Sequence, residues 1–275
     1  MNNSFEFLPL VTIGQFFPTG SIFHRRDPRA RLLFFTLILL AITFSPSLLG
    51  VIAALLVTLV GLILSRVPLR YALKGLLAPL PFLIFIALLQ LLFFSSTTGT
   101  VVYFKWGIIV LTQSSCLAAL LLLLRFLALI LWLSLMSFCL SSSEAISAMS
   151  ALLNPLNRLG VHTMDLVMSI QVAMRFLPLL AQTAERIAKA QASRGAEWGT
   201  KRGGIIAQIR RVVPLIVPLF VTSLRRSDTM ALAMDARAYG IQDRRTSLYP
   251  LTWKGRDTLL LLVGAVLTAG ILVIK

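Results

Sequence analysis

Two short segments of the chain each set an arginine among small residues close to a glycine. The first, Ala190–Gly195, contains Ser193-Arg194-Gly195, and the second, Ala233–Gly240, contains Ala236-Arg237-Ala238. A guanidinium carries five donors in a rigid fork that suits a carboxylate or a set of backbone carbonyls. Small neighbours leave that fork free to enter a narrow site on a partner, and the glycine can end a helix in the left-handed conformation. A lone arginine at such a place can simply complement the helix dipole, but its repetition favours a binding role.

Each arginine segment follows a stretch in which apolar residues recur at intervals of three and four. This spacing predicts two long amphipathic helices, which prolines at 178, 214 and 218 would kink. Such helices lie on a membrane or pack beneath it, with the apolar face toward lipid or other helices and the basic face toward water. The apolar positions are Met164, Val167, Ile170, Met174 and Leu177 in the first helix, and Ile205, Ile209, Val212, Ile216 and Leu219 in the second.

The composition places these helices in a membrane protein. Of the 275 residues 57% are hydrophobic and only 13% are charged, about half of the usual charged fraction, while the net charge is +16. A nucleic-acid-binding protein gathers such charge on a soluble surface, whereas this chain interrupts its charges with long apolar runs. The fold class is therefore predicted to be all-α and polytopic. The predicted spans are Leu32–Phe44, Leu48–Leu64, Ala72–Phe94, Trp106–Leu140 and Thr258–Ile274.

The fourth apolar region is too long for one straight span and contains Arg125. An arginine inside a bilayer is costly, so it marks either a break between two helices or a position that faces protein or the interface. Five spans are the main prediction and six the alternative.

The distribution of cations predicts the orientation. Cytoplasmic loops carry an excess of lysine and arginine, so the N-terminus and the loop after the second span are expected in the cytoplasm. With five spans residues 141–257 are cytoplasmic as well, and they hold 16 of the 26 cations and 8 of the 10 acids. The predicted organisation is a cytoplasmic segment 1–31, transmembrane helices 32–140, a cytoplasmic coupling module 141–257 and a last transmembrane helix 258–275, in the cell membrane.

Few other residues suggest chemistry. Asp27-Pro28 is suited to begin a helix, with Asp27 as N-cap and Pro28 at the first helical position, although Asp27 could instead pair with Arg25, Arg29 or a neighbouring cytoplasmic helix. Two histidines without supporting cysteines or paired carboxylates predict no metal site, and no cofactor is indicated. The chain contains no phosphate-binding loop and no hydrolase or metalloprotease motif, so it is predicted not to be an enzyme.

Together these motifs resemble the transmembrane (T) component of energy-coupling factor transporters, the CbiQ/EcfT-like family. The opening Ile13–Arg29 contains the pattern Ser-x-x-His-x-x-Asp-Pro-Arg, which ends in Asp27, Pro28 and Arg29. Arg175-Phe176-Leu177-Pro178 and the two arginine segments match the family in order and spacing, and the similarity covers most of the chain. The opening resembles the type that is shared among several substrate-binding proteins.

The resemblance implies a coupling subunit that joins two cytoplasmic ABC-type ATPases to a small membrane protein, the S component. The S component captures a vitamin or a transition-metal ion and thereby selects the substrate. Two Ala-Arg-Gly motifs end two coupling helices in this family, and each engages a groove on one ATPase. They correspond here to Ser193-Arg194-Gly195 and Ala236-Arg237-Ala238, with Ser for Ala in the first and Ala for Gly in the second. Arg175, Pro178 and Gly240 are expected to support them, and ATP-driven motion of the helices would let the S component topple.

Two alternatives remain from the residues. The permease of a conventional ABC importer carries one cytoplasmic coupling loop, whereas this chain has two arginine segments. An intramembrane lipid-modifying enzyme needs a cluster of carboxylates near the membrane face, but the acids of residues 141–257 are scattered.

Overall fold

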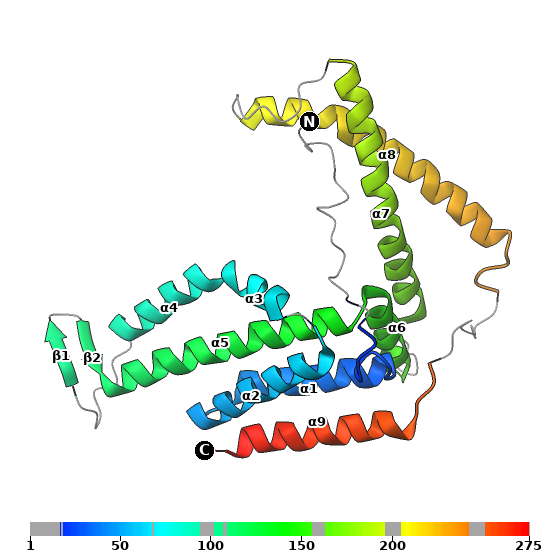
Figure 1. Cartoon of the computed structure of the whole chain (residues 1–275). Coiled ribbons are helices and arrows are strands. Elements are labelled where there is room, and N and C mark those ends of the chain that lie inside the picture. Colours follow the sequence, from blue (N-terminus) through cyan, green and yellow to red (C-terminus); the bar gives the residue numbers. More distant parts are fainter. Residues whose placement is uncertain are drawn as a thin grey trace. The chain divides into compact units, whose positions relative to one another are not determined.

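The computed structural model describes residue 17 and residues 19–67, 69–93, 102–106, 109–155, 163–195, 205–241 and 251–274 (Figure 1). The beginning of the opening motif, residues 13–16, and its Pro18 lie outside these ranges. The fold is all-α, as predicted, with one small two-stranded ribbon among the described residues. Helices and strands form two compact units, one within Gly14–Leu153 and Leu251–Lys275 and the other within Asn154–Pro250.

The first unit is built around four helices: α1 (Pro28–Phe44), α2 (Leu48–Ser65), α5 (Gln113–Cys139) and α9 (Gly255–Val273). α1 packs against α9 and α5, and α2 packs against α5 and α9. Aromatic rings fill the centre, where Phe35 and Trp132 lie 5.3 Å apart and the indole N–H of Trp132 donates to the Phe35 carbonyl at 2.8 Å. This bond satisfies the polar end of a fully buried side chain, as a buried tryptophan requires.

Four described helices, α2, α5, α7 and α9, have the length and apolar composition that a membrane span requires. The pair α3 (Leu69–Leu77) and α4 (Leu80–Phe93) adds a fifth if its two helices, bent by 57° at a break containing Pro79, form one span. Proline cannot continue the hydrogen-bond ladder of α3, which accounts for the break. The set differs from the predicted one, because α1 has only 17 residues and α7 (Thr163–Ser193) qualifies by composition.

α5 is one continuous helix through Arg125, so the break on which the six-span alternative depended is absent. The Arg125 guanidinium donates to the carbonyl of Ser45, in the turn that joins α1 to α2. Its charge therefore faces protein backbone, which was one of the two predicted solutions for a cation in an apolar helix.

The predicted start of the fourth span at Trp106 is wrong. Val102–Trp106 forms strand β1, which pairs antiparallel with β2 (Ile109–Thr112), and Trp106 is opposite Ile109. Aromatic and β-branched residues in both segments favour strand conformation. α5 begins only after Thr112, whose side chain caps the helix by accepting the Ser115 N–H.

The second unit consists of the helices α7 and α8 (Ile205–Asp235), each 31 residues long. Both are amphipathic helices of the predicted kind, and both contain the expected internal prolines. The short helix α6 (Ser142–Leu153) packs on α1 and belongs to the first unit. The second compact unit begins at Asn154, whereas the cytoplasmic extent 141–257 stays a prediction.

Candidate functional site

The first arginine segment lies at the C-terminal end of α7. The Arg194 N–H donates to the Gln191 carbonyl at 3.1 Å, so Arg194 still belongs to the last helical turn. The next residue, Gly195, has the left-handed conformation with φ +85°. The Gly195 N–H donates to the Ala192 carbonyl at 3.0 Å. A left-handed residue with this bond is the C′ position of a helix end. Arg194 therefore occupies the C-cap, and Gly195 has the left-handed conformation that its sequence position predicts.

The second arginine segment ends α8 with a complete Schellman motif. The Tyr239 N–H donates to the Met234 carbonyl at 3.0 Å, and the Ala238 N–H donates to the Asp235 carbonyl at 2.8 Å. These are the two bonds that define the motif, with Arg237 at the C-cap and Ala238 at C′. Ala238 has φ +58°, so this helix closes on alanine and not on Gly240, which also has a positive φ but lies two residues further on.

The two helix ends thus present the same local geometry. In each, arginine occupies the C-cap and a left-handed residue follows it. Arg194 and Arg237 are both exposed, and the described part of the chain provides no hydrogen bond or ion pair for either guanidinium. Their neighbours Ser193 and Ala236 are small and exposed as well. Both arginine forks are therefore available to a partner.

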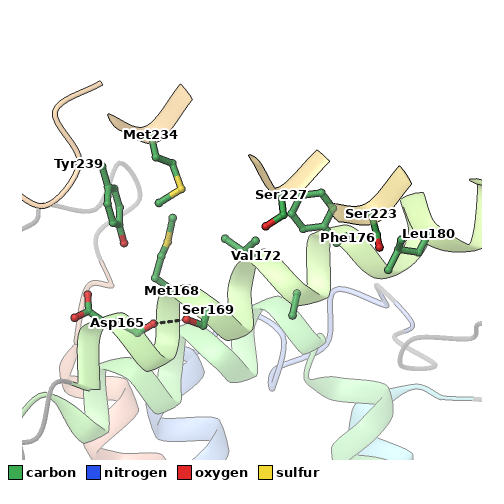
Figure 2. A pocket seen from close by; sticks show the side chains of 11 residues that line it. Asp165, Met168, Ser169, Val172, Phe176, Leu180, Ser223, Ser227, Met234 and Tyr239 are labelled. Atoms are coloured by element: carbon green, nitrogen blue, oxygen red, sulfur yellow. Dashed lines mark hydrogen bonds between the residues drawn. The ribbon is translucent and has the colours of Figure 1, made fainter. Parts of the chain in front are cut away.

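Packing of α7 on α8 leaves two grooves along the contact line, and Val172 and Phe176 of α7 border both of them. The first, which we call the hydroxyl groove, has a volume of about 550 Å³ (Figure 2). It brings Tyr239 and Met234, from the end of α8, close to Asp165 and Met168 at the start of α7. Its lining is completed by Ser169, Val172, Ala173, Phe176, Leu180, Ser223 and Ser227.

The second, which we call the arginine groove, has a volume of about 310 Å³. Arg175 contributes to it from α7 and Arg226 from α8, and the Arg226 guanidinium carbon lies 5.8 Å from the centre of the Phe176 ring. Arg175 was singled out in the sequence, but Arg226 was not, because only the packing of the two helices brings it beside the Arg175 segment. The groove is lined by Val172, Arg175, Phe176, Leu179, Arg226, Thr229, Met230 and Ala233.

Pro178 lies in the middle of α7, one turn beyond Arg175. Its ring removes one backbone N–H from the helix ladder. Like Arg175 it belongs to the helix that ends in Arg194, and the structure places neither residue at an arginine-bearing helix end.

The opening motif folds against the start of α1. Asp27 is the N-cap, as predicted, and accepts the Arg29 N–H at 2.9 Å with Pro28 in the first turn. The Arg29 side chain lies 4.0 Å from the same carboxylate, farther than the Arg29 N–H. The principal role of the Asp27 carboxylate is therefore to cap α1. Asp257 of α9 accepts the Asp27 N–H at 3.2 Å, a contact that the sequence did not indicate.

An ion pair between a buried arginine and a half-buried glutamate joins α1 to α6. The Arg31 guanidinium donates to Glu144 at 2.8 Å and to the Cys139 carbonyl at 2.8 Å, and the arginine side chain is 1% exposed. Burial alone would raise the pKa of Glu144, but its hydrogen bond to Arg31, the Arg31 charge and two bonds from Ser141 outweigh burial and lower that pKa. Glu144 is therefore ionised at neutral pH. In the sequence Arg31 is one of the basic residues that precede the first predicted span, and nothing there indicates Glu144 as its partner.

Within the described ranges no group of three or more histidine, cysteine, aspartate or glutamate residues is arranged to hold a metal ion. His24 instead hydrogen-bonds Ser21 at 2.8 Å within the opening motif. His162 lies outside the described residues.

Comparison with known proteins identifies the family of the chain. The family model for CbiQ, described as a cobalt transport protein, matches residues 19–248. The energy-coupling factor transporter transmembrane protein EcfT of Brevibacillus brevis is 34% identical over 257 residues, which cover 94% of this chain and 95% of the relative. EcfT of Clostridium kluyveri is 33% identical over 94% of each chain, and EcfT of Lactococcus lactis subsp. cremoris is 31% identical over 94% of this chain and 95% of its own. A multi-pass helical protein with this match over nearly its whole length belongs to the CbiQ family, as a transmembrane component of energy-coupling factor transporters.

Proposed function

We propose that the chain transmits the motion of two cytoplasmic ABC-type ATPase subunits to a substrate-binding S component, with Arg194 and Arg237 as the two contact points. The observation that carries this proposal is the matched geometry of the two helix ends. Each exposes, at a C-cap, one guanidinium that no described residue pairs with, among small residues that leave it room to enter a groove. A guanidinium in that position can form paired hydrogen bonds with a carboxylate or with backbone carbonyls of an ATPase.

The separation of the two arginines supports one contact for each ATPase. Tyr239 and Met234 share the hydroxyl groove with Asp165, so the Arg237 end of α8 lies beside the start of α7. Arg194 caps the opposite, C-terminal end of α7. At 1.5 Å per residue, the helix between these ends is roughly 40 Å long. Two contacts separated by that length suit two protein subunits better than they suit one small site on a single subunit.

The exposed apolar side of α8 is the surface we assign to the S component. Val213, Ile216, Val217, Phe220 and Leu224 are all exposed and recur at helical spacing. An apolar helical stripe of this kind needs lipid or another apolar surface to cover it. A shift of α8 driven from Arg237 would then move the surface on which the S component rests.

In this assignment the chain is a non-catalytic subunit, and ATP is hydrolysed on its partners. The vitamin or transition-metal ion is selected by the S component, and the opening motif favours a chain that serves several S components. The cation distribution favours a cytoplasmic N-terminus and a cytoplasmic α7–α8 unit in the cell membrane.

Charge reversal at the two arginines tests the proposal. Arg194→Glu and Arg237→Glu are expected to insert normally but to lose ATPase binding or to uncouple ATP hydrolysis from uptake in proteoliposomes that contain the complete transporter. Arg225→Glu is the matched control, because Arg225 is an exposed arginine of α8 that lines neither groove. Full transport by the double variant Arg194→Glu/Arg237→Glu would refute the proposed contact points.

A further inference from the structure

The arginine groove combines two cations with an apolar lining. Arg175 and Arg226 approach it from different helices, and both are exposed. The Arg226 guanidinium carbon lies 5.8 Å from the centre of the Phe176 ring, a cation–π contact that holds the guanidinium at the groove. Leu179, Met230 and Ala233 supply apolar contact beside the two charges.

Neither cation of this groove has a counter-charge in the described part of the chain. The ion pairs found there involve Arg29, Arg31 and Lys189, and none includes Arg175 or Arg226. Two like charges that line one groove repel each other, and an anion placed between them removes that repulsion. The groove therefore has the charge pattern of a binding site for a carboxylate or a phosphate.

The position of the groove on α8 indicates which partner supplies that anion. Arg226, Met230, Ala233 and Arg237 are spaced by four, three and four residues, so they follow one another along the same face of the helix. The exposed apolar stripe of α8 lies on another side of the helix. Phe220, which belongs to the stripe, precedes Ser223 by three residues and Ser227 by seven, so it shares their side of the helix. Both serines line the hydroxyl groove and not the arginine groove. The arginine groove thus lies on the side of α8 that leads to Arg237 and away from the apolar stripe.

We propose that the arginine groove binds an acidic side chain of the ATPase subunit that docks at Arg237. This inference rests on the proposed function and extends it, because it adds a second charged contact about three helical turns from the first. Arg226 and Arg175 would hold the carboxylate, while Met230 and Ala233 would pack against the rest of the partner segment. Two contacts on one face of α8 fix the angle between helix and ATPase, which a single arginine at a helix end cannot do.

The experiment measures binding of the purified ATPase pair to the full-length chain in lipid nanodiscs, at low and at high salt. We expect Arg226→Glu and Arg175→Glu each to lower the affinity about ten-fold at low salt and to weaken its salt dependence, because each reverses one charge at the interface. Arg225→Glu should change the affinity by less than about two-fold, and Arg226→Lys should retain most of it. Substituting acidic residues on the ATPase by arginine should reveal one position that restores binding of the Arg226→Glu variant.

Arg237→Glu separates failure of the proposed function from failure of the inference. If Arg237→Glu leaves both ATPase binding and the coupling of ATP hydrolysis to uptake intact, the proposed contact at Arg237 is wrong and the inference falls with it. If Arg237→Glu abolishes binding while Arg226→Glu behaves like Arg225→Glu, only the inference is wrong. The Arg175→Glu and Arg226→Glu variants could instead keep their ATPase affinity and lose bound anionic phospholipid, as measured by native mass spectrometry. That result would overturn the inference and identify the arginine groove as a lipid site.

Discussion

Replacing Ala238 by glycine should tighten the C-terminal end of α8. Ala238 has φ +58° and its N–H and that of Tyr239 close the helix by two backbone hydrogen bonds. An L-residue in this conformation brings its Cβ close to the following carbonyl oxygen, whereas glycine has no Cβ and adopts it freely. The related helix end on α7 already has glycine, Gly195, at the equivalent position with φ +85°.

The size of the effect follows from two opposing terms. Relief of the left-handed strain is worth about 1–2 kcal/mol. The added freedom of glycine in the frayed state offsets about 0.4–1 kcal/mol of that gain. The net stabilisation of the helix end is therefore about 0.5–1 kcal/mol, which corresponds to a factor of about two to five in the opening equilibrium.

Hydrogen exchange of the full-length chain in detergent or nanodiscs measures this factor directly. Peptides that contain residues 238 and 239 should exchange about two to five times more slowly in Ala238→Gly than in the wild type, because both amides are protected by the motif. The mirror substitution Gly195→Ala should speed exchange at the end of α7 by a similar factor. A Cβ at Gly195 meets no atom within 4 Å, so this second variant tests backbone conformation without a steric clash.

Equal or faster exchange at residues 238 and 239 in Ala238→Gly would refute the reasoning. It would mean that α8 does not close on residue 238 in the membrane-embedded protein. The combined variant Gly195→Ala/Ala238→Gly should show both changes independently, since the two sites lie at different helix ends.

Two further predictions concern the first unit. A Cβ at Gly50 would lie 2.7 Å from the Ile271 carbonyl oxygen, so Gly50→Ala should push α2 from α9 and destabilise the protein by about 2 kcal/mol in thermal unfolding. Gly270→Ala is the control, because a Cβ at Gly270 meets nothing within 4 Å, and equal melting temperatures of the two variants would contradict the packing. Because the pKa of Glu144 is lowered in the folded protein, its ion pair with Arg31 stabilises the fold fully above the unfolded-state pKa, about pH 4.3, and loses that effect as pH falls through the lower folded value. The melting-temperature advantage of wild type over Glu144→Gln should therefore be constant from pH 7 to pH 5 and shrink toward pH 3, and a pH-independent difference would exclude the pair as its cause.

Features that depend on neighbouring residues were predictable. Asp27 caps α1 because its carboxylate reaches the Arg29 N–H two residues away, and Gly195 ends α7 because glycine tolerates a positive φ. The long helices α7 and α8 follow from apolar spacing within each segment. The β-hairpin was missed because its residues continue the apolar run of α5, and short apolar runs do not distinguish strand from helix.

The sequence by itself determined the class of the protein, its family resemblance and the two arginine segments, since composition, spacing and helix-end chemistry are local properties. Only the tertiary structure decided where the other charges go. Arg31 meets Glu144, Arg125 meets the Ser45 carbonyl, and Arg226 joins Arg175 in one groove. Each of these pairings brings together residues far apart in the chain, so only helix packing selects them. The buried Arg31 must find acceptors wherever the fold supplies them, whereas Arg175 and Arg226 stay exposed beside their groove.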